Sequence, residues 1–273
     1  MAFAMALTVA IPFATVEGPL NEMTKPMRQS QETCCPIVEL RQYTLHPGKR
    51  DDLIDLFDRE FIETQEAVGI TVIGQFRDQN NPDRFVWLRG FRDMPSRARA
   101  LGDFYGGPVW KRHREAANAT MIDSDNVLLL RPARSSTGFS LRKDRPSIGG
   151  KAVHKGLVVA TIYYFETSVT DDFVSFFESK VKPVMENAGA SILGSFVTES
   201  SANTFPKLPV RESENVFVWF ASFRDQSAYE NSVTRLNRLP QWQNELSRDL
   251  KRRLKREPEV LKLSPTQRSQ LHR

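Results

Sequence analysis

Residues 70–76 read Ile-Thr-Val-Ile-Gly-Gln-Phe, and residues 190–196 read Ala-Ser-Ile-Leu-Gly-Ser-Phe. Gly194 follows Gly74 by 120 positions, and Phe196 follows Phe76 by the same interval. A shared spacing of this kind indicates two diverged copies of one domain, whereas a solenoid needs at least three units to bury a core. The sequence therefore predicts a tandem pair of related domains.

Two further motifs recur with a longer offset. Phe85-Val86-Trp87 and Phe91-Arg92-Asp93 return 132 positions later, at residues 217–219 and 223–225. The offset has grown by 12 residues, so the second copy carries an insertion between its second and third strands, within Thr198–Asn215. A hairpin loop tolerates such an insertion at low cost.

The composition is that of an ordinary water-soluble protein: 40% of the 273 residues are hydrophobic and 26% are charged. The net charge of +5 is small for this length, so nucleic-acid binding is not expected. Cys34 and Cys35 are adjacent and offer neither a metal-binding spacing nor a disulfide framework. They favour a reducing compartment, and we expect a cytoplasmic protein.

Residues 1–35 precede the first expected strand. Ala2–Val16 is apolar but lacks the basic residues of a secretory signal, and it is too short to span a bilayer as a helix. We expect translation to begin at Met23 or Met27 and the preceding residues to be a gene-model extension. A weak export signal is the alternative, and no membrane span is expected.

The first copy, residues 36–132, has the element order β-α-β-β-α-β. Period-two and helical patterns separated by turn residues predict these elements: strand Ile37–Leu45, helix Lys49–Val68, strands Ile70–Arg77 and Arg84–Phe91, helices Met94–Phe104 and 108–121, and strand Val127–Arg131. This order is typical of a ferredoxin-like α+β sandwich. The second copy should occupy residues 156–266, after an exposed linker, 133–155, and before a tail, 267–273. Two such sheets can bury their bare faces against each other, which predicts a pseudo-twofold α/β barrel within one chain.

Three stretches of the first copy resemble the NIPSNAP family: Val38–Leu45 (VELRQYTL), Phe104–Arg114 (FYGGPVWKRHR) and Asp123–Leu129 (DSDNVLL). The second copy resembles it more weakly, through its Phe-Val-Trp and Phe-Arg-Asp motifs. The resemblance implies membership of the dimeric α/β-barrel superfamily, in which two ferredoxin-like units close one barrel. It implies little chemistry, since that superfamily includes cofactor-free monooxygenases, haem-handling enzymes and isomerases.

Strand alternation separates two sets of residues in the first copy. One set is small and apolar and suits packing beneath helices: Val38, Leu40, Val86, Leu88 and Gly90. The other combines charged and aromatic side chains and should point into the barrel: Glu39, Arg41, Tyr43, Phe85, Trp87, Arg89 and Phe91. Such a mixture is typical of a small-molecule pocket.

We therefore expect a small hydrophobic or anionic ligand inside the barrel. Arg41 and Arg89 would hold the anion, Tyr43 and Trp87 would stack on the ligand, and Glu39 would orient the arginines. A structural ion-pair network made of the same charged groups is the alternative interpretation.

The second copy keeps the aromatic residues and loses the charges. Tyr43 and Trp87 map to Tyr163 and Trp219, whereas the three charged positions become apolar or neutral: Val159, Thr161 and Ala221. Groups that only stabilise the fold should be needed in both copies. The asymmetry therefore predicts that any site belongs to the first copy and that the second is a scaffold.

Two other function classes stay open. One is a cofactor-free monooxygenase or isomerase in which Glu39 or His113 accepts a proton, and the other is a non-catalytic scaffold or adaptor with a solid barrel. His113 shares a helix face with Trp110 and Ala117, where a hydrogen-bonded core histidine is the commoner role. The four histidines show no paired spacing, so we expect no metal and no cofactor. A pairing of two chains into a homodimer is also left open.

Overall fold

The computed structural model describes residues 1, 33–141, 145–149 and 156–272. Most of the expected N-terminal extension, residues 2–32, lies outside this range. Residues 32–273 form one compact unit. Every helix within the described ranges falls short of the length and apolarity needed to cross a bilayer.

The first half follows the predicted order of elements closely. Its elements are β1 (Ile37–Leu45), α1 (Arg50–Leu56), the π-helical turn η1 (Phe57–Phe61), α2 (Ile62–Glu66), β2 (Thr71–Asp78), β3 (Arg84–Phe91), α3 (Met94–Gly106), α4 (Pro108–Asn118) and β4 (Met121–Pro132). The expected helix over Lys49–Val68 is thus one helical run with a π-helical turn in its middle. It is followed by Gly69 at a φ of 89°, a backbone conformation that side chains other than glycine rarely adopt. Asp93 caps α3 by accepting from the Ser96 backbone N–H.

The second half repeats this order. Its elements are β5 (Leu157–Phe165), α5 (Asp171–Phe176), η2 (Phe177–Val181), α6 (Lys182–Asn187), β6 (Ser191–Thr198), β7 (Asn215–Phe223), α7 (Gln226–Arg238), η3 (Trp242–Leu246), α8 (Ser247–Arg253) and β8 (Glu259–Pro265). The insertion predicted from the change of offset is the loop 199–214 between β6 and β7. In the first half, the corresponding turn between β2 and β3 is only residues 79–83.

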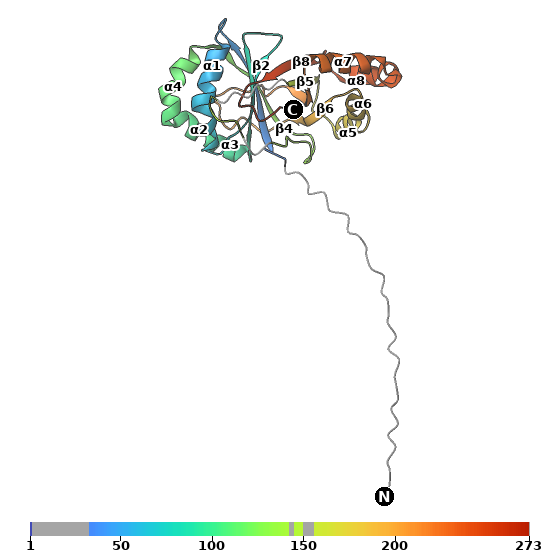
Figure 1. Ribbon diagram of the computed structural model, residues 1–273, viewed down its shortest axis with the longest axis horizontal. Helices are drawn as coiled ribbons and strands as arrows, with labels where there is room; N and C mark the ends of the chain where they lie inside the picture. The colour runs from blue at the N-terminus through green and yellow to red at the C-terminus, as the bar shows by residue number, and fades with distance from the viewer. Residues whose placement is uncertain (2–32, 142–144, 150–155, 273) are drawn as a thin grey trace. The chain divides into compact units, whose positions relative to one another are not determined.

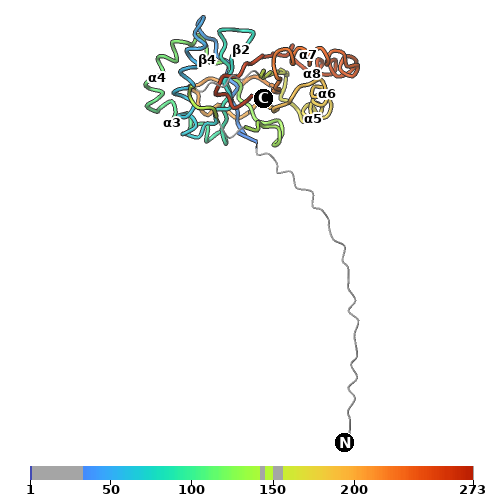
Figure 2. Tube along the Cα trace, in the orientation of Figure 1, coloured from blue at the N-terminus to red at the C-terminus, as the bar shows by residue number. Residues whose placement is uncertain are grey.

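The eight strands form a closed antiparallel barrel in the order β1-β3-β2-β8-β5-β7-β6-β4. Each half contributes four neighbouring strands, and the halves meet where β2 pairs with β8 and where β4 pairs with β6. Figure 1 shows α1–α4 and α5–α8 on opposite sides of the strands, and the trace in Figure 2 shows the same arrangement. Each set of helices therefore covers the outer face of its own half.

The inside of the barrel is packed with apolar side chains from both halves, among them Val38, Leu40, Val86, Leu88, Val158 and Phe220. This reverses the predicted faces, because Glu39, Arg41, Trp87 and Arg89 lie on the outer face, beneath the helices. Alternation separates the two faces of a strand without saying which one is enclosed. A barrel of eight strands is only wide enough for side chains to fill it, so buried charges find partners on the helix side.

The segments after β4 and β8 also differ from the expected exposed linker and tail. Phe139 and Leu271, each beyond the last strand of its half, are buried in the interior cluster of the barrel. Thr266, Arg268 and Ser269 are at most 3% exposed. Parts of both segments thus pack into the core, whereas Ser135, Ser136 and residues 147–149 of the linker are exposed.

Cys34 and Cys35 are joined by a disulfide in the structure. The bond links adjacent residues, so it ties no two elements together. The described residues contain only these two cysteines, so no disulfide joins distant parts of the described chain.

Candidate functional site

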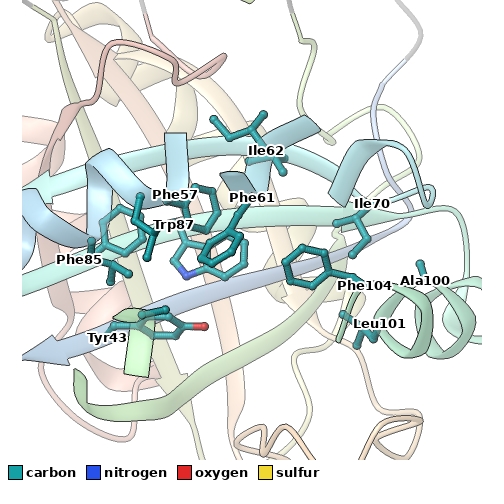
Figure 3. Close-up of a cluster of buried hydrophobic side chains, with 14 of the residues drawn as sticks. Tyr43, Phe57, Phe61, Ile62, Ile70, Phe85, Trp87, Ala100, Leu101 and Phe104 are labelled. Carbon is teal, nitrogen blue, oxygen red and sulfur yellow. The ribbon is translucent and has the colours of Figure 1, made fainter. Parts of the chain in front are cut away.

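The outer face of the first half is an aromatic layer between sheet and helices. Figure 3 shows Tyr43 and Trp87 from the strands facing Phe57 and Phe61 from the helical run. The Trp87 and Phe57 rings lie 4.8 Å apart, edge to face. Strands β1 and β3 pair as expected, with Arg41 opposite Trp87. The predicted residues therefore do come together, on the helix side of the sheet.

Glu39 is the centre of a buried ion cluster. Its Oε2 accepts from Arg41 Nη1 at 2.6 Å and from Arg89 Nε at 2.8 Å, and its Oε1 accepts from Arg97 Nε at 2.6 Å. All four side chains are at most 1% exposed. One carboxylate thus binds three guanidiniums, which is a geometry of charge-assisted hydrogen bonds. We call Glu39, Arg41, Arg89 and Arg97 the arginine cluster.

The cluster is poorly suited to proton transfer. Burial alone would raise the pKa of Glu39, but Arg89, Arg41 and Arg97 together hold it well below its usual range. A carboxylate so stabilised is a weak base near neutral pH. Cation–π contacts partly compensate the excess positive charge of the cluster, since the Arg89 guanidinium lies 5.1 Å from the centre of the Trp87 ring. The cluster thus resembles the structural network that the sequence left as an alternative.

Sequence reasoning missed Arg97 and the cover over the cluster. Arg97, on α3, donates through Nη1 to Asn203 Oδ1 at 2.9 Å and to Thr204 Oγ1 at 3.2 Å. Both acceptors lie on the 199–214 insertion, which comes from the other half of the chain. On the same insertion, Phe205 stacks on Tyr105 with 6.1 Å between ring centres. The insertion therefore covers the outer face of the first half.

Arg97 could have been found from the repeat. The offset of 132 maps it to Tyr229, which is the same loss of charge that Glu39, Arg41 and Arg89 show. The packing of residues 199–214 on the first half could not be predicted from the sequence, because a loop sequence does not reveal which half of a barrel it contacts.

Little free space remains beneath this cover. A cavity of about 30 Å³ lies among Tyr43, Phe61, Gln65, Trp87, Tyr105 and Trp110. This volume suits a single water molecule. This space between sheet and helices, next to the arginine cluster, therefore has no room for an organic ligand.

His113 stands apart from the arginine cluster. It is on α4, its side chain is 23% exposed, and its Nε2 lies 3.5 Å from Glu60 Oε2. Its ring approaches the edge of Phe61 at 6.5 Å between centres. Of the predicted helix face, Ala117 is buried while His113 is partly exposed. The two candidate proton acceptors thus lie in different places.

The second half contains a much larger space at the corresponding place. A cavity of about 240 Å³ lies between β5, β7 and the helices α7 and α8. Its buried wall is largely apolar and aromatic and includes Val159, Tyr163, Met185, Trp219 and Phe223. We call it the second-half cavity. It lies in the half that the sequence predicted to be a scaffold.

The repeat explains why the space is open. Val159, Thr161 and Tyr229, which line the second-half cavity, occupy the positions of Glu39, Arg41 and Arg97. Shorter side chains at the two strand positions vacate volume that guanidiniums and a carboxylate fill in the first half. In the first half the corresponding turn, residues 79–83, is short, and its Gln79 N donates to Lys262 O on β8. The loss of these charged side chains therefore accounts for the larger cavity in the second half.

The buried wall of the cavity includes an indole and a phenol group, and residues at its rim are partly exposed. The Trp219 side chain is buried and hydrogen-bonds to the Tyr163 hydroxyl. Burial raises the pKa of Tyr163, and the neighbouring Trp219 offsets this only partly, so the hydroxyl stays protonated. At the rim, Val233 and Val260 are each 37% exposed. Charged groups line the cavity only at this rim, as Lys251 and Glu257.

Among residues 33–141, 145–149 and 156–272, no group of three His, Cys, Asp or Glu side chains is placed to hold a metal ion. The second-half cavity is lined by a single carboxylate, Glu257, and by no histidine or cysteine. Its donor set is therefore suited to an organic molecule.

Two crystal structures share the fold over most of both chains. One is a protein from Fusobacterium nucleatum subsp. nucleatum, provisionally described as a monooxygenase, with 11% identity, a TM-score of 0.53, and coverage of 87% of this chain and 95% of that one. The other, similarly described, is from Lactobacillus acidophilus, with 16% identity, a TM-score of 0.51, and coverage of 86% and 97%. These likenesses support the fold, an eight-stranded antiparallel barrel with helices outside it.

The family comparison matches the NIPSNAP model to residues 38–137. A NIPSNAP family protein from Agrobacterium tumefaciens is 23% identical and covers 36% of this chain and 92% of its own, with a TM-score of 0.33. No curated protein matches the chain. The matched range spans β1 to β4 and includes the arginine cluster, so the first half of the chain matches a NIPSNAP domain.

Proposed function

We propose that this protein binds a small, neutral, largely apolar molecule in the second-half cavity. The observation that carries the proposal is the cavity of about 240 Å³, at the place that the arginine cluster fills in the first half. An engineered apolar cavity of about 150 Å³ binds benzene, so the second-half cavity suits a molecule of one or two rings. The absence of charged side chains from the buried wall argues against the anionic ligand that the sequence suggested.

In this proposal the two halves are tandem ferredoxin-like domains, 36–132 and 156–266, that have diverged in role. Glu39, Arg41 and Arg89 then serve structure, as an ion-pair network with Tyr43 and Trp87 packed beside it. Binding falls to the second domain, because its cavity combines this volume with an apolar wall. Cytoplasmic location and pairing into a homodimer remain predictions.

Titration with indane, a planar bicyclic hydrocarbon, tests the proposal on the purified full chain. We expect saturable one-to-one binding by calorimetry and a rise in the melting temperature with indane concentration, because a ligand that binds only the folded state stabilises it. Quenching of tryptophan fluorescence reports on the same event, since Trp219 and Trp242 line the cavity. If indane and larger two-ring hydrocarbons gave no saturable binding and no thermal shift, the proposal would be contradicted.

A cofactor-free oxygenase is the second candidate. It is favoured by the shared fold with two proteins described as monooxygenases, together with a cavity of suitable size and a protonated Tyr163 at its wall. Dioxygen would be the oxidant and a substrate CH₂ group the electron donor, giving a carbonyl group and one water. Neither Glu39 nor His113 lines the second-half cavity, so the substrate would have to lose its proton without them.

An oxygen electrode tests this candidate with 1,3-cyclohexanedione-type and phenolic compounds that have acidic CH₂ or OH groups. We expect oxygen consumption to depend on the folded chain and to persist in Glu39→Gln and His113→Ala. Loss of consumption in either variant while the protein remains folded would place the chemistry in the first half instead.

A further inference from the structure

The surface of the second half carries three arginines around one hollow. The hollow has a volume of about 720 Å³ and is lined by residues of α7, by Arg224 before that helix and by Gly189 after α6. The guanidiniums of Arg224, Arg235 and Arg238 belong to this lining, which contains no carboxylate. We call it the arginine hollow. Its charge makes it suited to an anion.

The polar side chains of the arginine hollow share one face of α7. Asn231, Arg235 and Arg238 follow one another at intervals of four and three positions, which makes them neighbours along a helix. Ser232 and Leu236, on another face of the same helix, line the second-half cavity. The helix α7 thus presents an apolar side to that cavity and a cationic side to the arginine hollow.

Two of the three guanidiniums are free to bind a ligand. Arg235 and Arg238 are exposed, and neither makes an ion pair or a side-chain hydrogen bond with another described residue. Arg224 forms an exposed pair with Asp225, with 3.0 Å between Nε and Oδ2. Arg235 Nη2 occupies the space that a Cβ at residue 189 would need, so the glycine at this position leaves room for the guanidinium.

The repeat shows that the fold does not depend on these cations. With the offset of 132, Arg235 and Arg238 correspond to Asp103 and Gly106 on α3 of the first half. A cation in the last turn of a helix also stabilises the helix through its dipole, which is a structural alternative for both arginines. The test must therefore measure binding rather than stability.

We propose that the arginine hollow binds a phosphate monoester group through Arg235 and Arg238, with Arg224 as a third partner. A guanidinium donates two parallel hydrogen bonds to phosphate oxygens, and a doubly charged phosphate is matched by more than one such group. A carboxylate carries a single charge, so three guanidiniums in a lining without acids favour phosphate. Asn231 and Thr234 line the same hollow and can donate to the remaining oxygens.

This inference does not rest on the proposed function. Arg224, Asn231, Thr234, Arg235 and Arg238 are not among the residues that line the second-half cavity. Failure of indane to bind would remove the proposed function and leave the present inference unaffected.

Calorimetric titration of the full chain with glycerol 3-phosphate, in a buffer free of phosphate and sulfate, tests the inference. We expect saturable binding, and a dissociation constant at least about ten-fold higher in Arg235→Ala/Arg238→Ala. Arg112→Ala/Arg114→Ala is the matched control, because it removes two exposed arginines from α4 in the first half and should bind as the wild type does. Alanine is favourable in a helix and all four positions are exposed, so both variants should fold.

A second experiment identifies the source of the phosphate group. Phosphatidic acid carries the same group in a lipid headgroup, and co-sedimentation with phosphatidylcholine vesicles that contain it measures binding to that form. Loss of either signal in Arg235→Ala/Arg238→Ala alone supports the site, and the probe that binds more tightly identifies a free phosphorylated molecule or a headgroup as the ligand. The inference is overturned if neither probe binds, if Arg235→Ala/Arg238→Ala binds as the wild type does, or if both double variants lose binding equally.

Discussion

Replacing Glu39 by Gln is expected to lower the free energy of unfolding by about 3–5 kcal/mol, because removing one partner from a buried ion pair leaves the others uncompensated. Three guanidiniums bind this one carboxylate, and each is at most 1% exposed. Gln and Glu have nearly the same volume, so the substitution creates no cavity that would add to the measured loss of stability. Equilibrium unfolding in urea measures the change.

Glu60→Gln is the control for this experiment. Glu60 is 33% exposed, and its carboxylate lies 3.5 Å from His113 Nε2. Exposed pairs contribute only about 0–1 kcal/mol, so a loss within this range is expected. If Glu39→Gln were no more destabilising than Glu60→Gln, the arginine cluster would not be the structural network that we infer.

The dependence of this effect on pH has a definite sign. The pKa of Glu39 is lowered in the folded state, so the folded chain binds this proton less readily than the unfolded chain does. The contribution of Glu39 is therefore complete above the unfolded pKa and is lost as the pH falls towards the folded pKa. The difference in stability between wild type and Glu39→Gln should be constant from neutral pH down to about pH 5 and shrink only in stronger acid.

The strands and their pairing were readable because local signals agree with one another. Period-two alternation and the Asn80–Asp83 turn define β2 and β3, and the repeat provides an independent copy of each element. The pairing of Glu39 with Arg89 and of Arg41 with Trp87 follows once β1 lies beside β3. The closed barrel could be predicted because two sheets that each have one face without helices can bury those faces against each other.

The choice of the enclosed face was wrong for a physical reason. Both faces of β1 are almost fully buried, so neither shows the contrast between apolar and exposed polar residues that normally marks the inside. The partners that make Glu39 tolerable beneath the helices are Arg97 on α3 and, through it, Asn203 on the insertion. These contacts join residues 58 and 106 positions apart in the chain and are invisible to any local pattern.

The same divergence accounts for both the filled space of the first half and the cavity of the second half. In the first half, charged side chains and the 199–214 insertion occupy the space between sheet and helices. In the second half, Val159 and Thr161 replace Glu39 and Arg41, and the space stays as a cavity. The loss of charge, which suggested a scaffold when read alone, thus creates volume. Whether a shorter buried side chain leaves a cavity depends on the residues packed around it, and the sequence does not identify those residues.

Filling the second-half cavity from its strand wall is expected to abolish binding without loss of stability. Val159 is 2% exposed and lines the cavity, so in Val159→Phe the added ring should enter the free volume. The free energy of unfolding should stay within about 1 kcal/mol of wild type or rise, because filling a void restores contacts. Indane binding should weaken by at least about ten-fold, since the ring occupies the ligand's place.

Val158→Phe is the matched control, one position away on the same strand. Val158 is fully buried inside the packed barrel, where an added ring must displace neighbours. Overpacking of that kind costs about 1–3 kcal/mol. The proposal thus requires opposite results from adjacent residues: Val159→Phe stable and unable to bind indane, Val158→Phe less stable and still able to bind it while folded. If Val159→Phe bound indane as the wild type does, the ligand would lie elsewhere, and the second-half cavity would be only a packing defect left by the loss of the arginine cluster.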